Sequence, residues 1–167
     1  MGTTRITAPE GMPFIDIERE FAAPRALVYR AYVDPELLKQ WLGPRKYVME
    51  VEVWEPRDGG RWRFIHRDSE HAYGFHGVFH GPQTEERMLQ TFEFEGAPGH
   101  VSLEALEFIE RDGRTLVKNH SVYQSIEARN AMIESGMEEG MNDGFDRLDE
   151  LLERLAAQEP AGAGAGR

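Results

Sequence analysis

Four polar residues lie in segments whose side chains alternate between polar and apolar. They are His66, Tyr73, Gln90 and Asn119. Because successive side chains of a β-strand point to opposite faces, the alternation places all four on the apolar face of their predicted strands. A few hydrogen-bonding groups that converge on an apolar cavity would orient a small molecule there. We therefore predict a ligand-binding site, although buried polar groups are also commonly satisfied by the backbone or by water.

Aromatic and methionine side chains are expected to form the walls of this site. The predicted strands contribute Trp62, Phe64, Met88 and Phe92, and the last helical region contributes Met137, Met141 and Phe145. Large apolar residues also fill ordinary hydrophobic cores, so their types alone do not distinguish a cavity wall from core packing.

Catalytic and metal chemistry find less support in the sequence. The chain has no cysteine, which excludes thiolate ligands and a cysteine nucleophile, and none of its serines lies in a recognisable nucleophile motif. His76 and His80 share a strand face, but four residues at ~3.4 Å each separate them by ~13 to 14 Å, too far to share a metal ion. We expect no metal and no cofactor. His66 is the one inward candidate for acid–base catalysis that the pattern offers.

The elements that position these residues follow one order along the chain. Residues 14–21 alternate as a strand, and residues 24–32 and 34–42 read as two short helices, with Asp34 as an N-cap and Gly43-Pro44 as a stop. From about residue 46 to 123 the period is two, which predicts six antiparallel strands. Val53 falls on the dry face of the first of these and Trp54 on the wet face.

The inward face is ambiguous in one of the later predicted strands and clear in another. In residues 101–109 both faces contain apolar side chains, so the pattern leaves the inward face open and suggests a bulge or a strand covered on both sides. In the last strand Lys118 marks the outward face. Thr115, Val117, Asn119 and Ser121 are therefore expected to point inward.

A helical region begins after Ser125, which is a suitable N-cap. Its apolar stripe consists of Ile133, Met137, Met141, Phe145, Leu148, Leu152 and Leu155. Ser135-Gly136 is the expected break or kink. Such a helix can bury its stripe only against the dry face of a curved sheet, and this packing commonly leaves a space between the two.

Length and charge restrict the function further. The 167 residues predict one domain at 13–158, after a loose lead-in at 1–12 and before a disordered Ala/Gly tail at 159–167. The net charge is −11, and residues 127–159 hold ten acidic residues and three arginines, so we expect no nucleic-acid partner. The chain has no apolar run of ~18 residues and no signal-peptide pattern, which predicts no membrane association and a cytoplasmic location.

Four segments carry a family resemblance: FAAPR at 21–25, AYVDPELLKQWLGP at 31–44, RDGGRWRF at 57–64 and GMEEGM at 136–141. In these segments the chain resembles the family named after the activator of the heat-shock protein 90 ATPase, within the START-like or SRPBCC superfamily. The resemblance covers about residues 14–155. It departs from the family pattern at Met141, where Trp is common, and at Glu55, where Asp is common.

The resemblance implies an α+β helix-grip fold of the order β-α-α-β6-α, with a curved antiparallel sheet around a long C-terminal helix and a cavity under that helix. It does not imply a reaction. We predict a domain that binds a hydrophobic or amphipathic small molecule in the cavity. The alternatives are a protein-interaction module that contacts a chaperone, with a role in stress response, and a cyclase- or hydrolase-like enzyme that uses the same cavity. A homodimer through the exposed sheet face is compatible with each.

Overall fold

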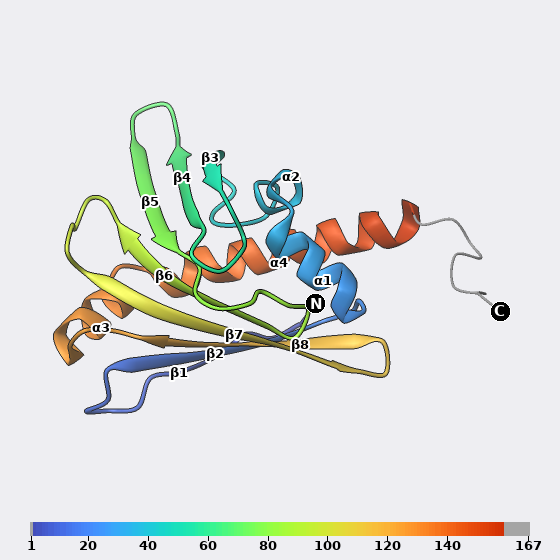
Figure 1. Ribbon diagram of the computed structural model, residues 1–167, viewed down its shortest axis with the longest axis horizontal. Coiled ribbons are helices and arrows are strands. Elements are labelled where there is room, and N and C mark those ends of the chain that lie inside the picture. Colours follow the sequence, from blue (N-terminus) through green and yellow to red (C-terminus); the bar gives the residue numbers. More distant parts are fainter. Residues whose placement is uncertain (1, 159–167) are drawn as a thin grey trace.

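The alternating segments build an eight-stranded antiparallel sheet in the computed structural model, which describes residues 2–158 (Figure 1). The strand order is β1-β2-β8-β7-β6-β5-β4-β3. The strands are β1 (Arg5–Thr7), β2 (Phe14–Phe21), β3 (Val48–Trp54), β4 (Arg61–Arg67), β5 (Ala72–Val78), β6 (Arg87–Phe94), β7 (Val101–Arg111) and β8 (Arg114–Val122). The helices are α1 (Arg25–Val33), α2 (Pro35–Leu38), α3 (Ile126–Glu134) and α4 (Met137–Gln158).

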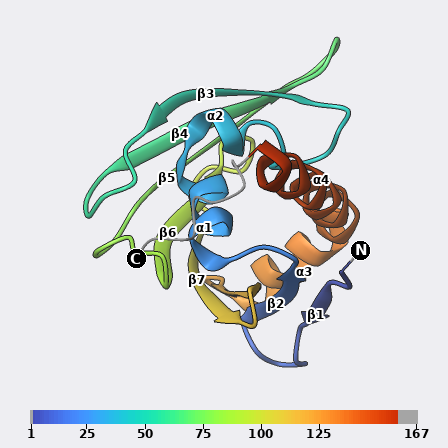
Figure 2. The ribbon, with the colours of Figure 1, turned by 90° about the vertical axis from the view of Figure 1, so that its right-hand side faces the viewer.

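The predicted α+β helix-grip fold is confirmed. The sheet curves around α1, α2 and α4, which lie on its concave side (Figure 2). Trp41, Phe21, Phe108 and Leu148 are among the fully buried side chains, so the core lies between the concave face and these helices. None of the helices within residues 2–158 is long and apolar enough to cross a membrane.

The N-terminal segment is more ordered than the sequence suggested. Residues 1–12 were expected to form a loose lead-in, but β1 pairs with β2 in antiparallel register, with Ile6 opposite Ile17. The side chain of Arg129, in α3, also donates a hydrogen bond to the Pro9 carbonyl at 2.5 Å. A three-residue strand is too short for periodicity to reveal it. The predicted tail at 159–167 lies outside the described residues.

A bulge in β3 overturns the predicted faces at the end of that strand. The register between β3 and β4 shifts between Val51 and Val53, after which Trp54 lies opposite Trp62. The extra residue reverses the alternation. As a result Trp54, assigned to the wet face, packs against the core, and its indole Nε1 donates to the Val33 carbonyl at 2.7 Å.

The C-terminal helical region is divided where the sequence predicted a break. Ser125 caps α3 by accepting a hydrogen bond from the Ala128 amide at 3.0 Å, and Gly136 separates α3 from α4 with a φ of 86°. A side chain would be strained at this angle. Ile133, expected in the buried stripe, is 39% exposed, because the stripe begins only after the break.

A buried cation fixes α4 to the sheet. Arg19 of β2 is 3% exposed, and its guanidinium donates to Asp149 at 2.5 Å and to Asp146 at 3.1 Å, both on α4. The guanidinium also lies over the rings of Phe21 and Phe145, at 5.6 and 5.7 Å from their centroids. These contacts set the position of α4 over the concave face.

Candidate functional site: the cavity beneath α4

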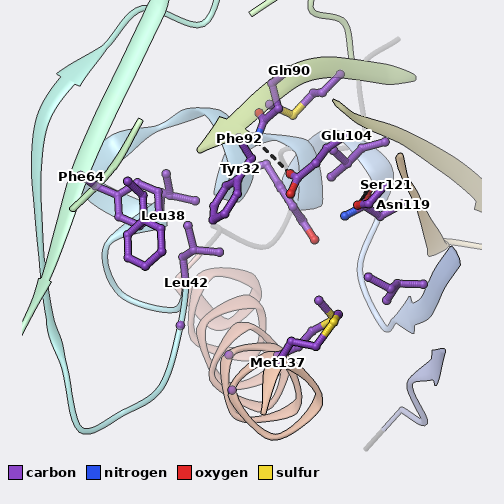
Figure 3. Close-up of a pocket in the computed structure, with 18 of the residues that line it drawn as sticks. Tyr32, Leu38, Leu42, Phe64, Gln90, Phe92, Glu104, Asn119, Ser121 and Met137 are labelled. Atoms are coloured by element: carbon purple, nitrogen blue, oxygen red, sulfur yellow. Dashed lines mark hydrogen bonds between the residues drawn. The ribbon is translucent and has the colours of Figure 1, made fainter. Parts of the chain in front are cut away.

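A cavity of about 290 Å³ lies between the concave face of the sheet and α4. Its walls come from α1, the segment around α2, the inner faces of strands β2 to β8, and the first turns of α4. Figure 3 shows Phe64, Leu38 and Leu42 on one side of this space and Asn119 and Ser121 on the other. Aromatic and aliphatic side chains make up most of the lining, and polar groups occupy fewer positions.

The structure brings together all of the predicted site residues except one. The residues that line the cavity as expected are His66, Gln90, Asn119, Trp62, Phe64, Met88, Phe92, Met137, Met141 and Phe145. Phe145 and the two methionines are only partly buried, whereas Leu148, one turn further along α4, is completely buried. The helix therefore contributes cavity wall at its start and core further on. That these residues contact a ligand stays a prediction.

Tyr73 does not belong to the lining. It lies opposite His66 in the β4–β5 ladder, on the predicted face of the sheet, but toward the end of β5 that extends beyond the cavity. Its ring contacts Tyr47 and His71, each at a centroid distance of 5.7 Å. Alternation gives the face of a residue but not its distance from the covering helix, which explains the wrong assignment.

His66 is a buried polar residue among aromatic neighbours. It is 8% exposed and stacks near Tyr47 and Phe64, with centroid distances of 5.9 and 5.0 Å. Burial, together with the positive charge of Arg147, lowers the pKa of His66 to about 4, against a hydrogen bond with the Leu42 backbone that raises it. The imidazole is therefore neutral at pH 7. Its Nε2 atom is buried and has no hydrogen-bond partner among the described residues.

Gly43 makes room for this imidazole. Its φ is 90°, and a Cβ atom at this position would collide with the His66 ring. Arg147 of α4 holds the loop by donating to the Gly43 carbonyl at 2.9 Å. The loop after α2 thus restrains the His66 ring on the side that faces away from the strands.

We expect Gly43→Ala to destabilise the protein by about 1 to 2 kcal/mol more than Gly59→Ala does. Both replacements place a side chain at positive φ, which carries a similar backbone cost. At Gly59 nothing lies within 4 Å of the new Cβ, so only Gly43→Ala adds a steric cost against His66. Chemical denaturation of both variants measures the difference. Equal losses would show that the loop does not confine the imidazole.

A row of polar residues crosses three strands beside the cavity. Gln90 of β6 lies opposite Glu104 of β7, and Glu104 lies opposite Ser121 of β8. The Gln90 amide donates to Glu104 at 3.3 Å, shown as a dashed line in Figure 3. The Ser121 hydroxyl donates to the Asn119 side-chain oxygen at 3.3 Å. Two of the predicted polar residues, Gln90 and Asn119, therefore have a protein partner as well as access to the cavity.

Glu104 is a candidate site residue that the sequence pattern did not predict. Burial raises its pKa to about 7, and the hydrogen bond from Gln90 opposes this only in part. The signal was present in the sequence, because Glu104 shares its strand face with Leu106 and Phe108, both buried. It was obscured because the other face of β7 also carries apolar residues, including Leu103, which is 42% exposed.

Two phenols border the same region. Burial raises the pKa of Tyr32, in α1, and of Tyr123, just after β8, and the nearby Glu104 carboxylate raises both further. Their hydroxyl groups are thus protonated at all physiological pH values. With Gln90 and Ser121 they make this end of the cavity a cluster of neutral hydrogen-bonding groups around one carboxyl.

Two glycines of α4 allow the helix to approach the loop after α2 closely. A Cβ atom on Gly144 would lie 3.1 Å from the Trp41 carbonyl, and one on Gly140 would lie 3.3 Å from the Pro44 ring. The helix thus packs closely against the loop after α2. This contact closes one side of the cavity.

Comparison with known proteins agrees with this architecture. The sequence profile of the family described as Activator of Hsp90 ATPase homolog 1-like protein matches residues 22–153. None of the curated protein sequences matches the chain.

Solved structures of similar fold come from several bacteria. A Rhodobacter sphaeroides protein is 27% identical, with a TM-score of 0.82 over 93% of this chain and 99% of that one. A Mycobacterium smegmatis protein is 24% identical, with a TM-score of 0.82 over 91% and 97% of the two chains. An Arthrobacter aurescens protein is 22% identical, with a TM-score of 0.82 over 98% of each chain.

Proposed function

The chain belongs to the Activator of Hsp90 ATPase homolog 1-like protein family, and we propose that it binds a hydrophobic or amphipathic small molecule in the cavity beneath α4. The observation that carries this proposal is the cavity itself, which is rich in aromatic side chains and has a volume of about 290 Å³. This volume is near the lower end, about 300 Å³, of pockets that hold small molecules. It is also larger than the roughly 150 Å³ apolar cavity that is known to accept benzene.

The unpartnered Nε2 atom of His66 supports the same proposal. A buried polar atom without a hydrogen bond costs free energy, so native proteins rarely leave one unsatisfied. In the neutral imidazole Nε2 either donates or accepts, depending on the tautomer. A ligand with a hydroxyl, carbonyl or amine group in the cavity supplies the missing partner. The remaining wall, formed by rings such as Trp62, Phe64 and Phe92, selects for an apolar body.

We expect compounds that fit the cavity to raise the melting temperature. A ligand that binds only the folded state at about 100 times its dissociation constant adds about 2.7 kcal/mol, which corresponds to about 5 to 10 °C for a chain of this size. A panel of small aromatic and branched aliphatic compounds, followed by thermal unfolding at increasing ligand concentration, measures this shift.

A cavity-filling variant tests the location of binding. Met141→Trp introduces a bulkier side chain with an indole ring into the lining, and it should abolish the ligand-induced shift while the variant still folds. Glu138→Trp places the same ring on an exposed position of α4 and should leave the shift unchanged. Failure of the whole panel, or a full shift with Met141→Trp, would reject the proposal. A role at the outer surface, such as contact with a chaperone, would then become the better explanation.

A further inference from the structure

The cavity lining contains one acidic side chain and, among the described residues, no lysine or arginine to balance it. Its titratable groups are Glu104, His66, Tyr32 and Tyr123. The two tyrosines and the histidine are neutral at pH 7, for the reasons given above. Glu104 is therefore the group that determines the charge of the cavity.

Glu104 is unusually poor in partners for a carboxylate in such a place. It takes part in none of the ion pairs formed within residues 2–158, and the hydrogen bond that it accepts from Gln90 is long, at 3.3 Å. An ionised carboxylate has about four acceptor sites, and burial without a cation or several donors is costly. This carboxyl group can therefore accept further hydrogen bonds on one side.

The aromatic walls favour the same kind of ligand as the carboxyl group. Trp62 and Phe92 have ring centroids 5.8 Å apart, and Phe64 and Phe75 are 5.2 Å apart, so several rings lie close together on the strands that face the cavity. The face of an aromatic ring carries partial negative charge and attracts cations, most of all where water is excluded. An aromatic wall beside an unpaired carboxylate is therefore complementary to a positively charged group.

We propose that the ligand is a hydrophobic molecule that carries a protonated amine, and that the amine binds Glu104 while the apolar body lies among the aromatic rings. This inference rests on the proposed function, because it names the ligand class of that cavity. It also excludes a class: a fatty acid or other carboxylate would meet like charge at Glu104 and no cationic side chain in the lining.

Three probes with the same apolar body distinguish the possibilities. They are 1-naphthylmethylamine, 1-naphthalenemethanol and 1-naphthoic acid, titrated calorimetrically near pH 8, where the amine is protonated and Glu104 is ionised. The amine should bind at least about tenfold more tightly than the alcohol, since charge-assisted hydrogen bonds are about twice as strong as neutral ones. The acid should bind more weakly than the alcohol.

Variants identify the residue responsible. Glu104→Gln should remove the preference for the amine over the alcohol, because the neutral amide cannot pair with the ammonium group. Glu107→Gln is the matched control: it lies on the same strand, but its side chain is exposed on the outer face, and it should preserve the preference. Thermal unfolding of both variants verifies that each is folded.

The pH dependence of amine binding provides a separate readout. Because the pKa of Glu104 is about 7, the ionised fraction of its carboxyl group, and with it the amine affinity, should rise about tenfold from pH 6 to pH 8, while alcohol affinity stays constant. The other titratable groups that face the cavity are Tyr32 from α1, His66 from β4 and Tyr123 after β8, and none changes charge in this range. Within the described chain, β2 and α4 contribute only uncharged residues to the lining.

The outcomes separate the two proposals. Equal binding of amine and alcohol, tighter binding of the acid, or an amine preference that persists in Glu104→Gln overturns the amine inference but leaves ligand binding in place. Failure of all three probes to bind counts against the proposed function, and the inference falls with it. An amine preference that is lost only in Glu104→Gln supports both.

Discussion

Glu104→Gln is expected to raise the free energy of unfolding by about 3 kcal/mol at pH 8 and to leave it unchanged at pH 4. Burial raises the pKa of Glu104 from 4.5 to about 7, so between these values the folded state binds more protons than the unfolded state. The contribution of Glu104 to the free energy of unfolding is fully present below pH 4.5 and is lost as the pH rises through 7. Each pKa unit corresponds to about 1.4 kcal/mol. Glutamine has the same shape without the buried charge, so it avoids this loss.

His66 acts in the opposite direction over nearly the same range. Its pKa falls from 6.5 to about 4 on folding, so the unfolded state binds more protons between these values and stability rises with pH. In the unmodified protein the two effects largely cancel between pH 4.5 and 6.5. Glu104→Gln should therefore show a free energy of unfolding that increases from pH 4 to 6.5.

Urea denaturation at half-unit steps from pH 4 to 8.5 measures both effects. Other titratable groups contribute equally to the variant and the unmodified protein, so the difference between them isolates Glu104. Glu107→Gln, on the outer face of β7, should follow the unmodified protein throughout. A difference below about 1 kcal/mol at pH 8 would mean that the Glu104 carboxyl is hydrated and that the cavity is wet at this end.

Arg19→Met should lower the free energy of unfolding by about 3 kcal/mol. The Arg19 side chain is 2% exposed and its guanidinium holds two aspartates of α4, so its removal leaves their negative charges without a partner. Breaking a buried ion pair in this way costs about 3 to 5 kcal/mol, and the lower end applies because Asp146 and Asp149 keep partial contact with solvent. Methionine retains most of the apolar contact with Phe21 and Phe145.

The matched control is Arg5→Met in β1. Arg5 pairs with Glu18 at 3.5 Å, but its side chain is 75% exposed, so its loss should cost no more than about 0.5 kcal/mol. Asp149→Asn should be less destabilising in the Arg19→Met background than in the unmodified protein, since the pair is already broken. Denaturation of the three single variants and of the double variant measures these differences. Equal losses for the two arginine variants would show that the buried pair does not anchor α4.

The sequence predicted most of the fold because its signals are local. Alternation located β2 to β8, proline and the Asp34 cap located the two short helices, and Gly136 divided the last helical region. The predictions that were wrong concern features that depend on contacts between residues distant in the sequence. The bulge that turns Trp54 inward inserts one residue without a marker, and β1 is ordered through pairing with β2 and through the hydrogen bond from Arg129.

The candidate site was predicted less completely for a similar reason. The strand faces placed His66, Gln90 and Asn119 toward one cavity, but depth along a strand is set by where α4 crosses it, and this excluded Tyr73. Glu104 was overlooked because β7 carries apolar residues on both faces. A carboxylate among buried apolar residues becomes informative only when its neighbours across the sheet are known.

The bulge in β3 also makes this edge of the sheet a poorer template for strand addition. β3 is an edge of the sheet, and a regular edge is a template on which another chain can add a strand and begin an aggregate. The shift between Val51 and Val53 interrupts the spacing that such a strand would have to match. Glu50 and Glu52 are exposed beside it and contribute negative charge, although both pair with arginines of β4. The residue that brings Trp54 into the core thus also interrupts the regular edge on which another strand would have to pair.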